Sequence, residues 1–508
     1  MSSKAFRFTR PEDLEIVGKP HLTVAVVIAC RGGQEKLNLV LASLAAQTYP
    51  SKLTSTYIID DGSETPIELP NIHPKNTKVI YYKNSAGKWG KTAATNDVAA
   101  KLKEDVIWFI DADMVFDPDH LSHHMKWHHS GDDYAVLGWK RFVDSWNYSP
   151  DDLFKKLNNG DFLDLHIQSW GKELWEERVN RTQDLSEPGI DGYRTFVGAT
   201  FSITNSRWKQ LGGYNRELVT GEDTELGWRV FMSGMRTVVD RQAHSWHLGH
   251  STVEKNKSEI QRHNEPSLAQ FIPQMHSIRA KYPFSWKVPT YQVLVDVRNS
   301  TLENLLKLDE QLLSLRGTTA HFTLLAPWSS LTLRYSPVSD ERADLREIHN
   351  WLKGDERFTM VEIEEDDYLT INQLLSYFSP SPTPYYLFVE GGWTPNLKDL
   401  VDLLLATGNG MVGVANKNDH RAFSLFAPAL ARAVESSGNI YSNIASQFGL
   451  LWITEESFLK RTQGQDKRLS KVIRYLQREG KKINSPRQLT IFLKKLTGLV
   501  IRKIVRRG

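Results

Sequence analysis

Apolar runs that stop abruptly at polar residues recur in the first quarter of the chain. They cover residues 22–30, 56–59 and 106–110, and each is followed by glycines or carboxylates. Short apolar runs of this kind predict buried parallel strands. Leucines at helical spacing follow the first run, which predicts a strand, a turn and a helix in succession. Because the carboxyl ends of parallel strands meet at one edge of a sheet, where open α/β sheets bind ligands, the pattern predicts an α/β fold with a site at that edge.

Asp111 and Asp113 end the third of these runs. Alternate residues of an extended segment point the same way, so both carboxylates can face one point, and Ala112 between them is small. Paired carboxylate oxygens suit Mg²⁺ or Mn²⁺ bound together with a diphosphate. The alternative is that the two acids cap the next helix, but Asp117 and Pro118 already supply a helix start. The spacing therefore favours a metal site.

Other polar residues at the predicted strand ends are candidates for binding a nucleotide. Asp60 and Asp61 follow the second run, although a simple Asp-Gly turn is the alternative. Arg31 follows the first run. Lys88 and Lys91 lie at a glycine-containing entry to a helix and are long enough to reach a phosphate, but a solvated lysine face is the simpler interpretation of that segment alone.

A predicted helix over residues 118–129 carries five histidines. His124 and His128 are one turn apart, which is a spacing found in metal sites, but the sequence offers no adjacent glutamate or third ligand. We therefore expect a helix on the protein surface.

Residues 139–193 show no clear period and are rich in aromatic and charged side chains, including Trp170 and Trp175. Long irregular segments in compact domains are usually functional or disordered. Since flat rings stack on sugar faces, we expect a binding loop here.

Acids and histidines between residues 222 and 250 complete the candidate site. Glu222 and Asp223 begin a predicted helix, where the helix dipole alone favours acids, so a structural and a catalytic role are both open. His244, His247 and His250 lie close together beside a glycine, and one of them is a candidate third metal ligand.

Between about residue 23 and residue 250 the chain resembles a family 2 glycosyltransferase of the GT-A fold. The resemblance rests on motifs that occur in the order of that family: VVIACRGG with a helix ending in AAQTYP, then IIDDGSE, FIDADM, LGGYN and GEDTELGWR. It implies an α/β fold with a GT-A mixed sheet and flanking helices.

The resemblance also implies roles for individual residues. In that family the acids after the second strand bind the nucleotide, which here means Asp60 and Asp61. The Asp-x-Asp pair, here Asp111 and Asp113, holds a divalent metal, Mn²⁺ or Mg²⁺, on the diphosphate of the donor.

The later motifs carry over in the same way. The acid of the Glu-Asp motif is the catalytic base, which here is Asp223 beside Glu222. Some members add a late histidine to the metal, and His247 is the best match, in competition with His244 and His250.

The chemistry fits these residues. An acceptor hydroxyl is a poor nucleophile at neutral pH, so a carboxylate must take its proton, and a divalent ion stabilises the departing diphosphate. We expect an inverting hexosyl- or N-acetylhexosaminyltransferase with a UDP-sugar donor and a glycan or lipid-linked acceptor, acting in polysaccharide or cell-envelope biosynthesis. A glycan-binding scaffold and a nucleotidyltransferase with the same metal site are the alternatives.

The second half of the chain repeats features of the first. Residues 293–299 with the following leucine-rich segment resemble residues 24–44, and the spacing from Phe109 to Leu121 equals that from Phe388 to Leu400. This alignment places Glu390 opposite Asp111, and Gly392 opposite Asp113. We expect domains at 1–285 and 286–460, the second a degenerate GT-A-like domain without catalysis, and a basic helical region at 461–508. An unrelated α/β domain is the alternative.

Composition limits the remaining possibilities. The 508 residues carry a net charge of only +3, which does not favour nucleic acid as a partner, and Cys30 is the single cysteine, which excludes disulfides. Without a signal core or a membrane-spanning run, a cytoplasmic protein is expected. The basic tail, residues 485–508, predicts either peripheral contact with the inner face of the cell membrane or a helix packed on its own domain. The second half is also a candidate for homo-oligomer formation.

Overall fold

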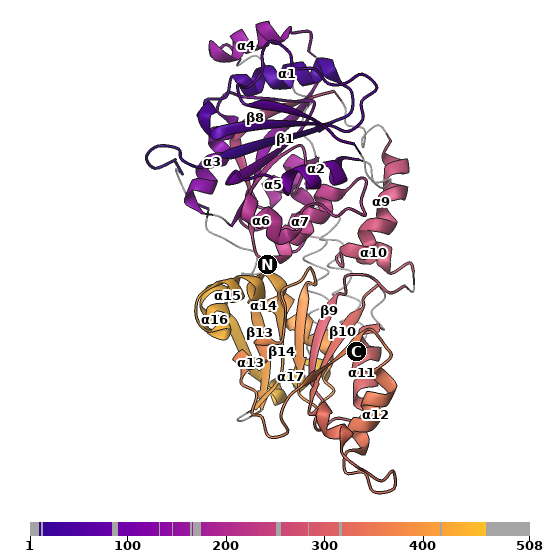
Figure 1. The fold of residues 1–508 in the computed structure, drawn as a ribbon. Coiled ribbons are helices and arrows are strands. Elements are labelled where there is room, and N and C mark those ends of the chain that lie inside the picture. Colours follow the sequence, from indigo (N-terminus) through magenta and orange to yellow (C-terminus); the bar gives the residue numbers. More distant parts are fainter. Residues whose placement is uncertain are drawn as a thin grey trace, which may run out of the picture. The chain divides into compact units, whose positions relative to one another are not determined.

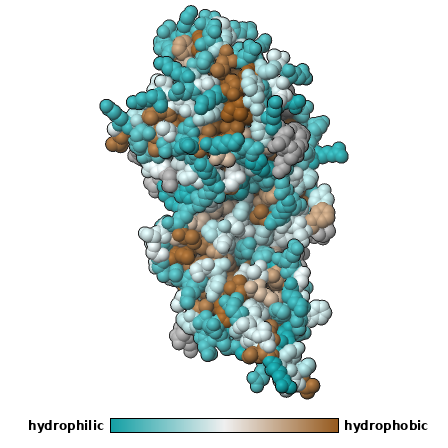
Figure 2. Space-filling view, viewed as in Figure 1, coloured by the Kyte–Doolittle hydropathy of each residue, from teal (hydrophilic) through white to brown (hydrophobic). Residues whose placement is uncertain are grey.

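The computed structural model describes residues 10–11, 14–83, 90–131, 133–144, 146–162, 165, 174–249, 256–282, 284–313, 317–416 and 419–463. The predicted tail helix at 485–508, together with Lys88, Trp170 and His250, lies outside these residues. No helix of the described part is long and apolar enough to cross a membrane. Figure 2 shows a face on which hydrophilic residues predominate, with smaller hydrophobic areas between them.

The first sheet is a mixed sheet with the strand order β3-β2-β1-β4-β7-β6-β8-β5. Strands β1, β2, β3 and β4 pair in parallel, whereas β7 is antiparallel to both β4 and β6. The strands are β1 Val24–Cys30, β2 Thr54–Asp60, β3 Thr77–Tyr81, β4 Val106–Asp111, β5 Met114–Phe116, β6 Tyr134–Val143, β7 Thr200–Thr204 and β8 Arg236–Leu248. The predicted parallel strands and their common edge are confirmed.

Helices cover both faces of this sheet (Figure 1). Successive residues of a strand face opposite sides of the sheet. Val26 of β1 therefore packs in one apolar cluster with residues of α1 and α3, while Val27 packs in another with α2, α6 and α7. The helices are α1 Gln34–Ala45, η1 Ser51–Leu53, α2 Lys91–Ala99, α3 His120–Ser130, α4 Pro150–Asn158, α5 Leu174–Arg181, η3 Gly192–Thr195, α6 Asn205–Leu211, α7 Glu222–Met232, α9 Lys257–Phe271 and α10 His276–Arg279.

The helix of histidines is not the surface helix that its polar sequence predicts. His124 in α3 is fully buried and His128 nearly so. Ser202 of β7 explains this, because its hydroxyl lies 2.8 Å from Nδ1 of His124 and 2.7 Å from Nε2 of His128. The two rings thus serve as core residues that hydrogen-bond to the sheet, and burial lowers the pKa of His128 to about 3, so the ring is neutral at physiological pH.

The aromatic segment is also more ordered than its pattern predicts. Its first part is the end of β6, and α4 and α5 follow. Trp175 is 6% exposed, packs against Trp139 and donates from Nε1 to the carbonyl of Thr195. This tryptophan is therefore a core residue, and its ring is not available to stack on a sugar.

A second sheet has the strand order β11-β10-β9-β12-β14-β13-β15. If β5 is left out and the strands of each sheet are numbered from 1 along the chain, both sheets have the order 3-2-1-4-6-5-7. The strands are β9 Tyr291–Asp296, β10 Ala320–Ala326, β11 Phe358–Glu362, β12 Tyr385–Val389, β13 Met411–Asn416, β14 Asp419–Phe426 and β15 Leu450–Thr454. The helices are α11 Leu302–Leu313, η4 Trp328–Thr332, α12 Ala343–Leu352, α13 Ile371–Ser376, α14 Leu397–Thr407, α15 Ala427–Glu435, α16 Ile440–Phe448 and α17 Glu455–Gln463.

Contacts within the chain group it into two units, Met1–Val412 with Phe423–Leu451 and Gly413–Ala422 with Trp452–Gly508. This grouping does not follow the domain boundaries predicted from the sequence, at 285 and 460, which stay a prediction.

Candidate active site

Asp111, Asp113 and His247 meet at the carboxyl-terminal edge of the first sheet. Asp111 is the last residue of β4, and the chain turns through Asp113 into β5. Strand β5 then pairs with β8 so that Met114 lies opposite His247. One ligand atom from each of the three side chains lies within 4.8 Å of the others. A predicted pair of acids thereby gains the third ligand from a strand more than 130 residues later.

The hydrogen bonds of His247 suit a metal ligand. Its Nδ1 lies 3.0 Å from the carbonyl oxygen of Gly249, which can only accept, so Nδ1 carries the proton. The lone pair of Nε2 then faces Asp113, whose Oδ1 is 3.4 Å away. Histidines that bind metals commonly donate their other ring N–H in this way. His244 is three residues earlier in β8, and alternation along a strand directs its side chain to the opposite face.

Two lysines neutralise the carboxylates. Nζ of Lys91, at the start of α2, lies 2.6 Å from Oδ1 of Asp111 and 3.8 Å from Oε1 of Glu222. Burial opposes its charge, but Asp111, and to a smaller extent Glu222, outweigh burial and hold the pKa of Lys91 well above its usual value. Lys36 of α1 lies 3.6 Å from Oδ2 of Asp113 and donates to the carbonyl of Leu248.

Lys36 is a site residue that the sequence reasoning missed. A signal was present, because Lys36 falls in the first turn of the helix that follows the glycine pair after β1. A residue at that place lies beside the strand ends of a parallel sheet.

The candidate nucleotide residues at the end of β2 differ in exposure. Asp60 is 3% exposed, and its carboxylate accepts hydrogen bonds from the backbone N–H groups of Ser63 and Ile67. Burial raises the pKa of Asp60, but these bonds outweigh it and lower the pKa. Asp61 is half-buried and accepts from the N–H of Gly90, and burial raises its pKa, against the charge of Arg31. Asp60 therefore shapes the loop, while Asp61 joins it to α2.

The acids at the start of α7 lie beside the metal candidates. Asp223 accepts the N–H of Gly198 at 3.1 Å and that of Thr224 at 2.6 Å, so its carboxylate is held between β7 and α7. A Cβ on Gly198 would lie 3.2 Å from Cβ of Asp223, tighter than most Cβ contacts, so glycine eases the approach of the two segments. Burial, against the charge of Lys91, raises the pKa of Glu222 to about 7. The prediction that both acids begin a helix is confirmed.

The sequence of residues 25–196 matches the model of glycosyl transferase family 2. Residues 25–196 belong to a family 2 glycosyltransferase domain. The match covers about a third of the chain and includes Asp60, Asp61, Asp111 and Asp113, whereas Asp223 and His247 lie beyond it. The mixed sheet with its flanking helices is the GT-A fold that the sequence resemblance implies. A search among curated proteins gives no match.

Several solved glycosyltransferases show a distant structural likeness. GalNAc-T7 with UDP, GalNAc and Mn²⁺ has 16% identity and a TM-score of 0.32 over 46% of this chain and 44% of that one. TarS 1–349 of S. aureus has 15% identity and a TM-score of 0.32 over 45% and 60%. The mannosyltransferase PcManGT from Pyrobaculum calidifontis, with GDP-Man and Mn²⁺, has 14% identity and a TM-score of 0.34 over 54% and 68%. The chain thus spans less than two thirds of the first two of these proteins.

Proposed function

We propose that this chain is an inverting, metal-dependent glycosyltransferase that moves a sugar from a nucleoside diphosphate donor, a UDP-sugar, to a hydroxyl of a glycan or lipid-linked acceptor. The observation that carries the proposal is the group of Asp111, Asp113 and His247 within a domain of glycosyl transferase family 2.

The three side chains fit a divalent ion such as Mn²⁺ or Mg²⁺. Two carboxylates and one imidazole are hard to borderline ligands, and three protein ligands leave positions for the diphosphate. When bound, such an ion neutralises charge that develops on the departing diphosphate. Lys91 and Lys36 pair with Asp111 and Asp113 in this structure. Because a bound cation would neutralise these two acids, the ammonium groups of both lysines would become available to phosphate oxygens. Asp61 and Arg31, above the loop that Asp60 holds, are the candidates for the nucleoside.

Asp223 is the proposed general base. Its two backbone hydrogen bonds fix its carboxylate. Oδ1 also accepts from the hydroxyl of Thr224, so Oδ2 is the oxygen with a second lone pair for the proton of an acceptor hydroxyl. Glu222, with its pKa near 7, is the second candidate, because a base works best when its pKa is near the working pH. Direct attack by the acceptor in one step inverts the anomeric centre.

The acceptor and the place of action belong to the same proposal. A lipid-linked acceptor would bring the protein to the inner surface of the cell membrane, where the basic tail, residues 485–508, suits contact with anionic lipids. Removing the tail after Ser485 should release the protein from anionic vesicles without unfolding it. If the full chain shows no vesicle binding, the tail has another role.

Binding of the donor tests the proposal directly. Calorimetric titration of UDP in the presence of Mn²⁺ should show binding that is lost with EDTA and in Asp113→Asn, while the melting temperature of the variant stays near that of wild type. Retained Mn²⁺-dependent affinity in Asp113→Asn contradicts the metal assignment. Release of UDP from UDP-sugars, rather than pyrophosphate from a nucleoside triphosphate, separates sugar transfer from nucleotidyl transfer, and a glycan-binding scaffold releases neither.

A further inference from the structure

A pocket lies in the first half of the chain, away from the acids of the candidate active site. Its volume is about 460 Å³, within the range typical of small-ligand sites. The floor is the face of the sheet that α1 also covers, and the walls are residues 44–51, at the end of α1 and the turn after it, and residues 71–75. Leu121 of α3 and Phe154 of α4 also line it.

Thr56 is a polar residue in the floor of this pocket. The register of the strands places Thr56 of β2 beside Val26 of β1, and Val26 beside Trp108 of β4, so the three form one row. All three line the pocket. Thr56 is 1% exposed, and its hydroxyl has no hydrogen-bond partner among the described residues. Buried hydroxyls are normally satisfied, so Thr56 offers an unused hydrogen-bonding group beside the pocket.

The rest of the lining limits the charge of that ligand. Lys75 is the one charged residue among the described residues that line the pocket, and it lies exposed at the rim. The last turn of α1 contributes Leu44 and Ala45, and the carboxyl end of a helix carries partial negative charge. A phosphate or nucleotide would therefore meet an unfavourable field with one exposed cation to offset it. The lining favours an uncharged ligand.

The polar and apolar lining groups alternate in a way that suits a sugar ring. Nδ1 of His73 donates to the carbonyl of Pro70 at 2.7 Å, which leaves Nε2 as an acceptor for a ligand hydroxyl. Ser51 adds a hydroxyl at the rim, and Phe154 adds a half-buried aromatic ring. Aromatic surface pairs with the C–H face of a pyranose, while hydroxyl and imidazole groups bond to its edge. We propose that this pocket binds an uncharged monosaccharide unit, with Thr56 as its buried hydrogen-bond partner.

The pocket is separate from the donor site. Thr56 precedes Asp60 by four residues along β2, which is roughly 13 Å at the rise of a parallel strand. The pocket therefore lies toward the opposite end of the strands from Asp111 and Asp113. If Asp111 and Asp113 bind no metal, the pocket can still bind a sugar. If the pocket binds no sugar, the metal site is unaffected.

Ligand-observed NMR with neutral methyl glycosides of glucose, galactose, mannose and N-acetylglucosamine tests the pocket on the full chain. At least one should bind wild type at millimolar concentration. Thr56→Val keeps the shape of the side chain and should weaken that glycoside by about threefold to tenfold, the effect of one lost hydrogen bond. Its melting temperature without sugar should not fall, because the change removes a buried unpartnered hydroxyl. Thr237→Val is the matched control, since Thr237 of β8 is also buried with an unpartnered hydroxyl and does not line the pocket.

A second variant keeps the test decisive if Thr56→Val changes little. Ser51→Tyr places a ring in the mouth of the pocket and should abolish binding. The proposal is overturned if no glycoside binds wild type at roughly 100 mM, where even affinities much weaker than millimolar are detected. It is also overturned if binding survives Ser51→Tyr, or if it is lost in Asp111→Asn, which would place the sugar at the strand ends. If a tetrasaccharide binds more tightly than its methyl glycoside, the ligand of the pocket is a unit of a glycan chain. If the two bind equally, the ligand is a free sugar.

Discussion

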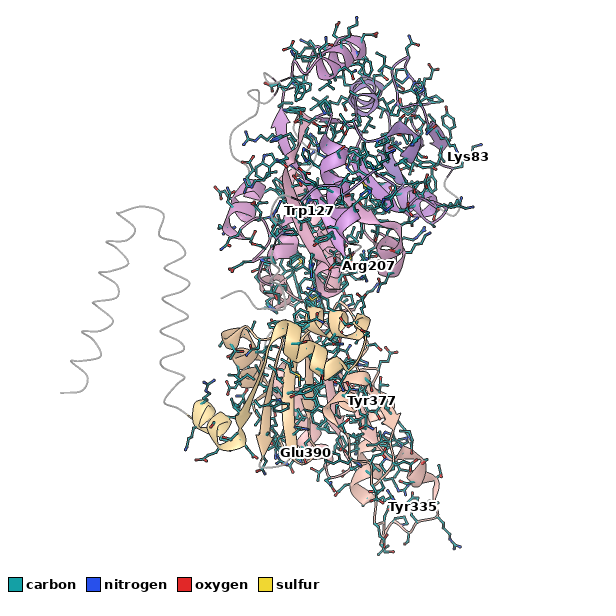
Figure 3. The ribbon with its side chains drawn as sticks, turned by 90° about the vertical axis from the view of Figure 1, so that its left-hand side faces the viewer. Lys83, Trp127, Arg207, Tyr335, Tyr377 and Glu390 are labelled. Carbon is teal, nitrogen blue, oxygen red and sulfur yellow. The ribbon has the colours of Figure 1, made fainter. Side chains whose placement is uncertain are left out.

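The two sheets repeat one strand order and differ at the edge where their central strands end. In the first sheet this edge carries Asp111, Asp113 and His247. At the corresponding places the second sheet carries Glu390 and Gly392 (Figure 3 labels Glu390 at the end of its strand). Among the described residues no other group of three such ligands gathers in the chain. The second sheet also has no counterpart of β5 among the described strands, and β5 is the strand that brings the acids of the first sheet to His247.

Arg298 closes the edge of the second sheet. Its Nε and Nη2 donate to the carboxylate of Asp296 at 3.0 and 2.7 Å. Its Nη1 donates to the carbonyls of Glu364, Glu365 and Asp367. A side chain that binds three carbonyls of one loop keeps the loop after β11 against the end of β9. The first sheet has cations at this edge too, but there they lie against candidate metal ligands.

The two glycines after β12 pack tightly against the end of β9 and the segment that follows it. A Cβ on Gly391 would lie 2.2 Å from the carbonyl oxygen of Asp296, and one on Gly392 would lie 2.9 Å from that of Asn299. Gly392 also has a φ of 76°, which side chains rarely adopt. An acid at Gly392, the place that Asp113 holds in the first sheet, would therefore need the backbone to move.

The cores of the two sheets are more alike than their edges. Phe109 and Phe201 stack at 4.9 Å in the first sheet, and Phe388 and Phe423 lie at 5.3 Å in the second. Apolar packing depends on many residues, whereas a metal site depends on three or four. A copy can therefore keep its fold after losing its chemistry. The strand order supports the interpretation of the second sheet as a degenerate GT-A-like copy, which stays a prediction.

The largest predicted difference between the two edges concerns their carboxylates. Asp111→Asn should lower sugar transfer by about 10³ or more, because a metal contributes several kcal/mol to stabilising the transition state. Glu390→Gln makes the same chemical change in the second sheet and should leave transfer to a small acceptor unchanged. Initial rates with a UDP-sugar and Mn²⁺ measure both. Loss of transfer in Glu390→Gln, or Mn²⁺ bound there in a crystal, would show a second active site.

The second prediction concerns the base, for which the second edge has no proposed equivalent. Asp223→Asn should keep the affinity for UDP and Mn²⁺ but lower turnover by about 10² to 10⁴, the contribution of a general base. Titration of UDP and steady-state rates separate the two quantities. Glu222→Gln serves as the control with the neighbouring acid. If Asp223→Asn retains activity within a few-fold and Glu222→Gln does not, Glu222 is the base.

The third prediction concerns the pH dependence of stability and compares α3, which follows the edge of the first sheet, with α14, which follows the edge of the second. His120 and His128 of α3 have folded pKa values of about 3, caused first by burial, against about 6.5 when unfolded. Between these values the unfolded chain binds more protons, so stability is complete above about pH 6.5 and falls as the pH falls. At pH 5 the loss should be about 2 kcal/mol for each of the two histidines.

Urea unfolding at pH 7 and pH 5 measures this loss, and the second sheet supplies a control. Leu403 of α14 holds the place that His124 holds in α3, and Ser424 bonds to the carbonyl of Leu400 rather than to a histidine. His124→Leu should therefore reduce the pH dependence by about one proton, since the pKa of His124 is also lowered by burial. Equal stability of wild type at the two pH values would contradict the burial of this cluster.

The smallest effect is predicted for Arg298. Arg298→Gln removes charge-assisted hydrogen bonds to Asp296 and should destabilise the chain by about 2 to 3 kcal/mol, measured by urea unfolding. Sugar transfer to a small acceptor should not change, because the hydrogen bonds of Arg298 to described residues all join parts of the second sheet. Lys91→Gln is the contrasting variant, and it should lower donor affinity. Lost transfer in Arg298→Gln, with the fold intact, would give the second edge a part in catalysis.

Much of the first sheet was predictable from the chain itself. The apolar runs and their polar stops correspond to β1, β2 and β4, and the acids at 222 and 223 begin α7 as expected. These are local properties, since a strand or a helix start depends on residues adjacent in sequence. The spacing from Phe109 to Leu121 likewise found the counterpart strand and helix in the second half.

The chain alone predicts the strands that end at the site, the paired acids at the end of β4 and the resemblance to a glycosyltransferase family. The neighbours of His247 could not be read from the chain, because the register between β5 and β8 sets His247, rather than His244, beside the two acids. The structure also put Lys36 beside Asp113 and buried the histidines of α3 on Ser202. Each of these contacts joins residues far apart in the chain, and no local pattern of polar and apolar residues encodes which distant partner a side chain will meet.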